Sequence, residues 1–255
     1  MTKLTVDHIA AVAVIILVGE PRRLFVEIKD DGLPIKAFRR TLCPPGGNWI
    51  SEAARNDYGP RDTLARELTE EFSLRNEPAS TRELRLLGDI PTGEFYRVPS
   101  LGVEPTETDT RSFEELKCVI IQGCLSFGDF MVTVPKAVFD RADPQNRRED
   151  MTYIVSYWVS VLQQKHGKKL AVLQRKFGNL SNESITLITS LKEIAEVGMK
   201  WAYGHDKPLR QLFLDMGLLA AERLPLTDGT SADLIGPSLD SYADYLKRYN
   251  VLRRP

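Results

Sequence analysis

The chain has 255 residues, of which 42% are hydrophobic and 27% are charged, and its formal net charge is -1. This length suits one large domain or two small ones, and the composition is ordinary for a soluble globular protein. A nearly neutral chain gives no electrostatic reason to expect nucleic acid or an anionic membrane as the main partner.

The cysteines and the N-terminus narrow the class of protein further. Three cysteines, Cys43, Cys118 and Cys124, form neither an even set nor a metal-type spacing, so we expect reduced thiols rather than a disulfide framework or a zinc site. The N-terminus has no basic region followed by a cleavage site, so no signal peptide is expected. The longest apolar run, residues 9–18, is too short for a bilayer, which needs about 20 residues. We expect a cytoplasmic enzyme or binding protein.

The first third of the chain predicts strands that lead into a glycine turn and then a helix. The run 9–18 is nearly all Val, Ile and Ala, which is typical of a strand covered on both faces. Strand-like segments follow at 24–29 and 37–42, and 48–59 has the composition of a loop. Pro60 suits the first turn of a helix that runs to about residue 72 or 73.

The remainder alternates between further strands and helices. Such alternation favours an α/β layered domain, and we find no interdomain linker before residue 225. Strands are predicted at 84–90, 93–98, 118–125, 130–134, 152–162 and 184–189, helices at 163–177, 191–197, 208–222 and 239–249, and loops or linkers at 99–111, 140–150 and 225–238.

Three carboxylates gather on the first predicted helix. Glu67, Glu70 and Glu71 stand at i, i+3 and i+4, so they fall within about a third of its circumference. Such like charges repel one another, and a divalent cation would reverse that cost, since Mg²⁺ is held by carboxylates together with substrate phosphates. A solvated acidic face is the alternative. The adjoining apolar residues Leu64, Leu68 and Phe72 place the acidic face at the edge of the core instead.

The same stretch resembles the signature of the Nudix hydrolase family. Residues 66–74, Arg-Glu-Leu-Thr-Glu-Glu-Phe-Ser-Leu, match its second half, and the Pro44-Pro45-Gly46-Gly47 turn matches its start. Segments 9–29, 184–194 and 204–209 resemble the opening strands, the last strand with its short helix, and the entry to the closing helix. The resemblance implies one Nudix-like domain over 1–255, with a core at about 7–218 and a helical C-terminal extension at 219–255. The implied fold is a three-layer α/β/α sandwich with a mixed sheet.

Two positions depart from the family pattern. The spacing between the glycines and Arg66 is about five residues too long, so the family's first glutamate falls on Tyr58 when counted back from the helix and on Glu52 when counted forward from Gly46. Ser73 also replaces a glycine, which suggests a different helix end because a left-handed C-cap prefers glycine.

The resemblance also implies roles for individual residues. Carbonyl groups of Gly46 or Gly47 and the carboxylates of Glu67, Glu70 and Glu71 would ligate Mg²⁺ or Mn²⁺, with Glu183 as an added ligand from the loop before the last strand. Glu70 or Glu67 would activate the attacking water, and Arg66 would brace the glutamates.

Several of these residues have plainer alternatives. Arg66 is equally able to pair with Asp62 at i-4, and Glu183 on position alone is an exposed loop residue. His205 is expected to cap a helix or fill the core. Aromatic side chains at Trp49, Tyr96, Trp158 and Tyr203 are expected to pack in the core rather than stack on a base.

The implied activity is hydrolysis of a phosphoanhydride bond in a nucleoside diphosphate linked to another group. The expected partner is therefore a small nucleotide, with no nucleic acid or membrane and with a homodimer as an open possibility. The alternative is a Nudix-fold module that binds a nucleotide and regulates without catalysis, and a weaker third class is a structural protein with an acidic helix. The sequence leaves the substrate and the general base open.

Overall fold

The computed structural model describes residues 5–29, 33–50, 57–74, 103–142, 149–218, 231–236 and 252–253. In this part of the chain an eight-stranded sheet runs in the order β4-β3-β2-β7-β6-β9, with β5 paired to β2 and β8 paired to β3. Strands β2 and β7 are parallel and the other pairs of this sheet are antiparallel, so the sheet is mixed. A separate pair joins β1 (Thr5–Val6) to β10 (Leu252–Arg253). The sheet strands are β2 (His8–Leu17), β3 (Arg23–Ile28), β4 (Leu42–Cys43), β5 (Gly46–Asn48), β6 (Leu125–Val134), β7 (Met151–Leu162), β8 (Ile185–Ser190) and β9 (Ser231–Gly236).

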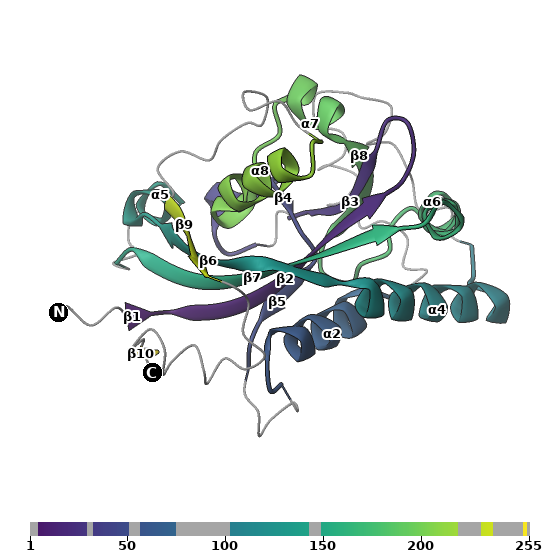
Figure 1. Cartoon of the computed structure of the whole chain (residues 1–255), viewed down its shortest axis with the longest axis horizontal. Coiled ribbons are helices and arrows are strands. Elements are labelled where there is room, and N and C mark those ends of the chain that lie inside the picture. The colour runs from purple at the N-terminus through teal and green to yellow at the C-terminus, as the bar shows by residue number, and fades with distance from the viewer. Residues whose placement is uncertain are drawn as a thin grey trace.

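Helices cover both faces of the sheet, as Figure 1 shows, with α7 and α8 above it and α2 and α4 below. Alternate residues of β2 enter two different cores, with Val12 and Val14 in one and Ala13 and Ile15 in the other. This is why the segment is apolar at almost every position. The three-layer α/β/α arrangement expected from the sequence is confirmed. The helices are α2 (Pro60–Glu71), α4 (Glu107–Gly123), α5 (Lys136–Ala142), α6 (Gln164–Phe177), α7 (Leu191–Val197) and α8 (Asp206–Asp215), with 3-10 turns η1 (Lys36–Phe38) and η3 (Ala202–Gly204).

One edge of β2 is shared by two strands. Residues 15–17 of β2 pair with β3, whereas residues 10–12 pair with β5. Beyond its pairing with β2, strand β3 pairs with β4 at residues 27–28, while β8 pairs with β3 along its whole length. The sheet therefore forks beside the middle of β2, and the short glycine strand β5 fills one arm of the fork. This fork places the loop that follows β3, the glycine strand and α2 near one another.

The expected loop at 99–111 and the expected strand at 118–125 are both wrong over the described residues. Helix α4 occupies Glu107–Gly123, and Thr106 and Asp109 form a reciprocal capping box at its start. The apolar residues Phe113, Leu116 and Ile120 are spaced as one face of a helix and enter the core beside α2 and α6. The apolar residues 119–121 resemble a strand when taken alone, because Phe113 and Leu116, which complete the apolar face of the helix, lie upstream of them.

Other boundaries also differ from the sequence expectations. The element expected at 37–42 is the turn η1 followed by β4, the linker expected at 225–238 contains β9, and α5 occupies the start of the loop expected at 140–150. Helix α8 ends at Asp215, before the expected residue 222. The segments 84–90, 93–98 and 239–249 lie outside the described residues, as does most of the 219–255 extension. No helix in the described ranges is both long and apolar enough to cross a membrane.

The capping box makes α4 sensitive to one hydroxyl group. Thr106→Ala removes the side-chain acceptor for the Asp109 amide, and we expect a loss of about 1 kcal/mol in unfolding free energy, or about 2–4 °C in Tm. Thermal unfolding followed by circular dichroism measures the change. The matched control is Thr108→Ala, at an exposed position two residues further along the chain. Its unfolding free energy should stay within about 0.5 kcal/mol of the wild-type value. Equal melting temperatures for the two variants would contradict the role of the cap.

Candidate active site

Helix α2 carries the acidic cluster and is anchored by its apolar side. Pro60 stands at its first turn, and Leu64 and Leu68 are buried in the core beneath the sheet. The adjoining face carries Glu67 and Glu71 toward the glycine strand β5 and the end of β3. The helix therefore begins and ends close to where the sequence predicted, because the proline at its first turn and the apolar spacing agree.

The glycine pair is required by two different close approaches. Gly46 has φ of +138°, and a Cβ atom there would overlap the backbone carbonyl of Ala11 on β2. Gly47 has an ordinary φ, but a Cβ atom there would overlap the carboxylate of Glu67. Gly46 is thus needed for β5 to pair closely with β2. Gly47 lets the carboxylate of Glu67 lie against bare backbone.

Arg66 binds the acidic residues from behind. Its guanidinium group contacts Oε1 of Glu67 at 2.7 Å and Oε2 of Glu70 at 2.9 Å, and it donates to the backbone oxygen of Asn48 at 2.7 Å. These charge-assisted contacts tie α2 to the end of β5. Asp62 is not among its partners, so the alternative pairing at i-4 is not formed.

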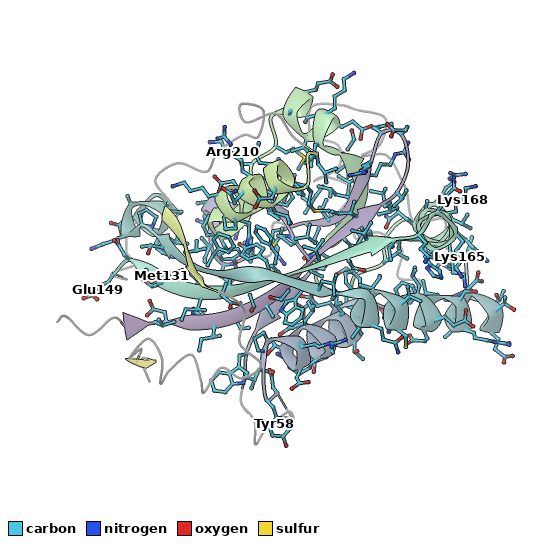
Figure 2. The ribbon with its side chains drawn as sticks, in the orientation of Figure 1. Tyr58, Met131, Glu149, Lys165, Lys168 and Arg210 are labelled. Atoms are coloured by element: carbon cyan, nitrogen blue, oxygen red, sulfur yellow. The ribbon has the colours of Figure 1, made fainter. Side chains whose placement is uncertain are left out.

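A buried aspartate, Asp57, also pairs with Arg66, and the sequence analysis did not single it out. Asp57 is fully buried, its Oδ2 lies 3.3 Å from Arg66, and its Oδ1 accepts a hydrogen bond from Thr63. Tyr58, one of the two expected positions for the family's first glutamate, is 55% exposed and lies at the outer edge of the molecule in Figure 2. Glu52, the other position, lies outside the described residues. The available signal was a carboxylate one residue before Tyr58.

Glu71 is the carboxylate of the cluster whose surroundings most disfavour the charged form. Its side chain is buried, with Glu71 3% exposed, and its Oε2 atom has no hydrogen-bond partner among the described residues. Burial raises the pKa of Glu71 to about 9, and the neighbouring carboxylates of Glu27, Glu67 and Glu183 act in the same direction, while Lys29 opposes them. Burial also raises the pKa of Glu67, against the opposing effect of Arg66. Such a pair of carboxylates is a ready acceptor for positive charge.

Glu27 on β3 and Lys29 just past its end form a largely buried ion pair that the sequence analysis did not single out. Nζ of Lys29 lies 3.2 Å from Oε2 of Glu27 and donates to Oγ of Ser184 at 3.3 Å. Burial opposes the charge on this lysine, yet interaction with Cys43, Glu27 and Glu71 holds the pKa of Lys29 above its usual value. Charged residues at alternate positions of an otherwise apolar strand were the signal for this pair, since alternation puts both on one face.

The loop before β8 is fastened to the end of α2, which brings Glu183 to the cluster. The backbone amide of Asn182 donates to the carbonyl of Glu71 at 2.8 Å, and its side chain donates to the carbonyl of Glu70 at 3.0 Å. Ser73 donates its hydroxyl to the Asn182 side chain. The helix ends at Phe72 in an extended conformation, so the serine needs no left-handed backbone and instead holds the loop.

These elements surround a cavity of about 530 Å³ that opens at the fork in the sheet. Glu67, Glu71 and Glu183 line it together with both glycines, whereas Glu70 does not, because it is turned toward Arg66. The other lining residues are His8, Ala10, Val12, Lys29, Leu33, Pro34, Ile35, Cys43, Asn48, Ile50, Met151, Tyr153, Val155, Tyr203 and His205.

The oxygen donors that line this cavity are of the kind that suits a hard divalent cation. Carboxylate oxygens and a backbone segment without side chains are what Mg²⁺ and Mn²⁺ prefer, and the unpartnered Oε2 of Glu71 supplies a buried oxygen. Within the described ranges, however, no three His, Cys, Asp or Glu side chains stand close enough together to hold a metal ion. Arg66 occupies Oε1 of Glu67, so binding a cation requires a local rearrangement of these carboxylates.

The remaining candidates separate into core and cavity residues. Trp158 is buried in the core beside α4 and α6, as expected, and Trp49 donates from its indole to the carbonyl of Asp57 at 2.7 Å. His205 stands at the start of α8 without capping it through its side chain, and it lines the cavity. Tyr203 also lines the cavity, so its assignment to the core alone is incomplete. Tyr96 lies outside the described residues.

Comparisons with known proteins give a likeness of structure and none of sequence family. No protein-family model matches the sequence, and no curated protein matches it. The chain is similar to a crystal structure of a NUDIX hydrolase from Alicyclobacillus acidocaldarius, at 15% identity and a TM-score of 0.38, over 75% of this chain and 82% of that one. The α/β layering of the present chain stands on its own strand pairing and its two cores.

The two glycines should respond differently to the same substitution. Gly46→Ala strikes the backbone of β2 in a positive-φ conformation, and we expect a loss of several kcal/mol in unfolding free energy, comparable to other overpacked cores. Gly47→Ala meets only the end of the flexible Glu67 side chain, so the fold should survive with a much smaller loss. Chemical denaturation measures both losses. Gly19→Ala, where the added atom has ordinary contacts, is the control, and equal stability losses at 46 and 47 would refute the distinction.

His205 should make the fold sensitive to acid. Burial lowers the pKa of His205 to about 3, with a contribution from Lys29, against 6.5 for the free side chain. Below pH 6.5 His205 is protonated in the unfolded chain but stays neutral in the folded chain. The unfolding free energy therefore falls as pH drops toward 3, by up to about 1.4 kcal/mol per pH unit. When the stability of each protein is expressed relative to its own value at pH 8, His205→Gln should lose less stability at low pH than the wild type. Denaturant midpoints between pH 4 and 8 test this, and parallel curves would contradict it.

Proposed function

We propose that this protein is a metal-dependent hydrolase that cleaves a phosphoanhydride bond in a nucleoside diphosphate linked to another group. The observation that carries the proposal is that Glu67, Glu71 and Glu183 line one cavity, where the Glu67 carboxylate lies against the bare backbone of Gly47. Burying several like charges together is unfavourable unless something positive is bound there. The resemblance of the α2 sequence to the Nudix signature supports a divalent cation as that partner.

The residues suited to hold Mg²⁺ or Mn²⁺ are Glu67, Glu71 and Glu183, with Glu70 and the carbonyls of Gly46 or Gly47 as further candidates. When bound there, the cation would neutralise charge that develops on the diphosphate during its hydrolysis. The cavity behind the carboxylates is large enough for part of the substrate.

A carboxylate of the same cluster is the best candidate to take the proton of the attacking water. Glu67 or Glu70 fits that role in the proposal, and Glu67 has the advantage of lining the cavity. Arg66 holds one oxygen of each, which orients the remaining oxygens. Asp57 holds Arg66 in turn and accepts a hydrogen bond from Thr63, so Asp57 and Thr63 act by positioning.

A nucleotide-binding module without catalysis is the alternative. It is favoured by the way Arg66 engages Glu67 and Glu70 and by the dispersed arrangement of the carboxylates among the described residues. In such a module the guanidinium group of Arg66 would remain paired with Glu67 and Glu70, where a metal ion would bind in a hydrolase. The two functions differ in turnover, not in ligand class.

The proposal predicts hydrolysis of at least one nucleoside diphosphate derivative in the presence of Mg²⁺ or Mn²⁺. Glu71→Gln and Glu70→Gln should each lower kcat/KM by about 100-fold or more, since even outer-shell partners of a metal cost 10–100-fold. A chelator should abolish turnover, and added Mg²⁺ should restore it. Phosphate-monoester products are measured by chromatography over a broad substrate panel.

The matched control is Glu196→Gln, because Glu196 is an exposed residue of α7 whose ion-pair partner among the described residues is Lys192 at 3.6 Å. It should keep wild-type activity. Full activity in both cluster variants would refute the assigned roles. Tight metal-dependent nucleotide binding without any turnover would favour the regulatory module.

A further inference from the structure

The last turn of α2 has no left-handed residue at its end, so its terminal carbonyl groups take donors from elsewhere in the chain. Phe72, the C-cap residue, is extended, with φ of -87° and ψ of 120°. The backbone amide of Asn182 donates to the carbonyl of Glu71 at 2.8 Å, and its side chain donates to the carbonyl of Glu70 at 3.0 Å. A residue 112 positions further along the chain than Glu70 therefore caps the helix.

Ser73 fixes the orientation of this capping side chain. The carbonyl of Glu70 can only accept a hydrogen bond, so the NH₂ group of Asn182 must face it. The side-chain oxygen of Asn182 then faces Ser73, whose hydroxyl group donates to it. The two side chains thus act as one unit, which we call the Ser73–Asn182 clamp.

Backbone contacts on either side of Phe72 extend the clamp. Phe72 and Ser181 form an antiparallel bridge, and the amide of Ser73 donates to the carbonyl of Leu180 at 3.3 Å. The chain that leaves α2 and the loop before β8 therefore lie against each other as a short antiparallel pair. Such pairing holds the backbone of both segments and leaves the side chains that project from them free to turn.

Glu183 lies between two anchored neighbours in this loop. Asn182 is bound to α2, and Oγ of Ser184 accepts a hydrogen bond from Nζ of Lys29, just past β3, at 3.3 Å. The amides of Glu183 and Ser184 both donate to Oγ of Ser181, at 3.3 and 3.2 Å. The backbone of Glu183 is therefore held from both sides, although the residue itself is exposed.

The other carboxylates of the cluster are held through their side chains instead. Arg66 contacts Glu67 and Glu70 by ion pairs, and a cation must compete for the oxygens that it occupies. The clamp joins the carbonyl of Glu71 to the amide of the residue before Glu183. Side-chain ion pairs can exchange partners while the fold is kept, whereas backbone pairing between two elements changes only when the elements separate. The rearrangement that a cation requires therefore falls on the Arg66 side.

We propose that Asn182 and Ser73 are positioning residues for a preformed half of the cation site. The clamp that they form keeps the backbone of Glu71 and Glu183 in place, while the side chains that Arg66 holds form the half that adapts. Neither Asn182 nor Ser73 is among the described residues that line the cavity, so both act through the carboxylates, as outer-shell partners of metal ligands do. The role toward a metal rests on the proposed function, and the clamp itself does not.

Amide hydrogen exchange in the whole, metal-free protein tests the clamp. Ser73→Ala removes the hydroxyl donor, so the backbone amide of Asn182 should exchange about tenfold faster than in the wild type, which corresponds to the loss of about one hydrogen bond. Ser73→Thr keeps a hydroxyl group and should exchange at close to the wild-type rate. NMR measures the three rates, and equal rates in all three proteins would overturn the clamp.

Binding of Mn²⁺ alone, followed by electron paramagnetic resonance, tests the positioning role. Asn182→Ala should weaken Mn²⁺ binding by about tenfold or more, while its Tm should fall by less than about 3 °C because Asn182 is exposed. Ser73→Ala should also weaken binding, and Ser73→Thr should restore it. The double variant should bind no more weakly than Asn182→Ala alone, since both changes remove the same unit.

Thr106→Ala is the control for stability, because it weakens the cap of α4 and not the clamp, and it should keep wild-type Mn²⁺ affinity. Equal losses of affinity in Thr106→Ala and Asn182→Ala would show an effect of stability alone and overturn the positioning role. Wild-type affinity in Asn182→Ala would overturn it as well and leave the proposed function standing. Failure of the wild-type protein to bind Mn²⁺ would remove the proposed function and the metal role together, and faster exchange in Ser73→Ala would still confirm the clamp.

Discussion

The structure around the cavity depends on how a few cationic groups balance a larger number of buried carboxylates. On α2, Glu71 lies near Glu27 from β3, and both Glu67 and Glu71 lie near Glu183 from the loop before β8. Arg66 offsets this charge from one side and Lys29 from the other. An uncompensated buried carboxylate would cost several kcal/mol, so both cations are structural requirements. The compensation is still incomplete, because an oxygen of Glu71 has no partner among the described residues.

The fork in the sheet makes that charge balance possible. A continuous sheet beside β2 would have filled the space that the cavity now occupies. Because β3 and β5 share one edge of β2, the glycine strand can approach α2 while Lys29, just past β3, approaches from the other arm. The close contact between Gly47 and the Glu67 carboxylate is a direct result. The fold and the site are therefore linked through two glycines that have different reasons to be there.

Much of this was readable from the sequence, and the failures have identifiable causes. The long strand β2, the helix α2 with its acidic face and the pair β8–α7 follow from strong periodicity and good caps, and they lie where the sequence placed them. Helix α4 was missed because three consecutive apolar residues resemble a strand, although the capping box at Thr106 was visible. Asp57, Glu27 and Lys29 escaped because their roles depend on strand pairing across the fork, which local sequence does not encode.

The choice between a hydrolase and a binding module reduces to the behaviour of Arg66. In the present arrangement its guanidinium group holds Glu67 and Glu70 at 2.7 and 2.9 Å, and a cation must compete for the same oxygens. Asp57 makes that competition feasible, because a buried carboxylate 3.3 Å away keeps the guanidinium compensated even if it releases a glutamate. A site built only to hold Arg66 against the glutamates would have no need of this additional buried charge. The presence of Asp57 therefore argues for carboxylates that change partners.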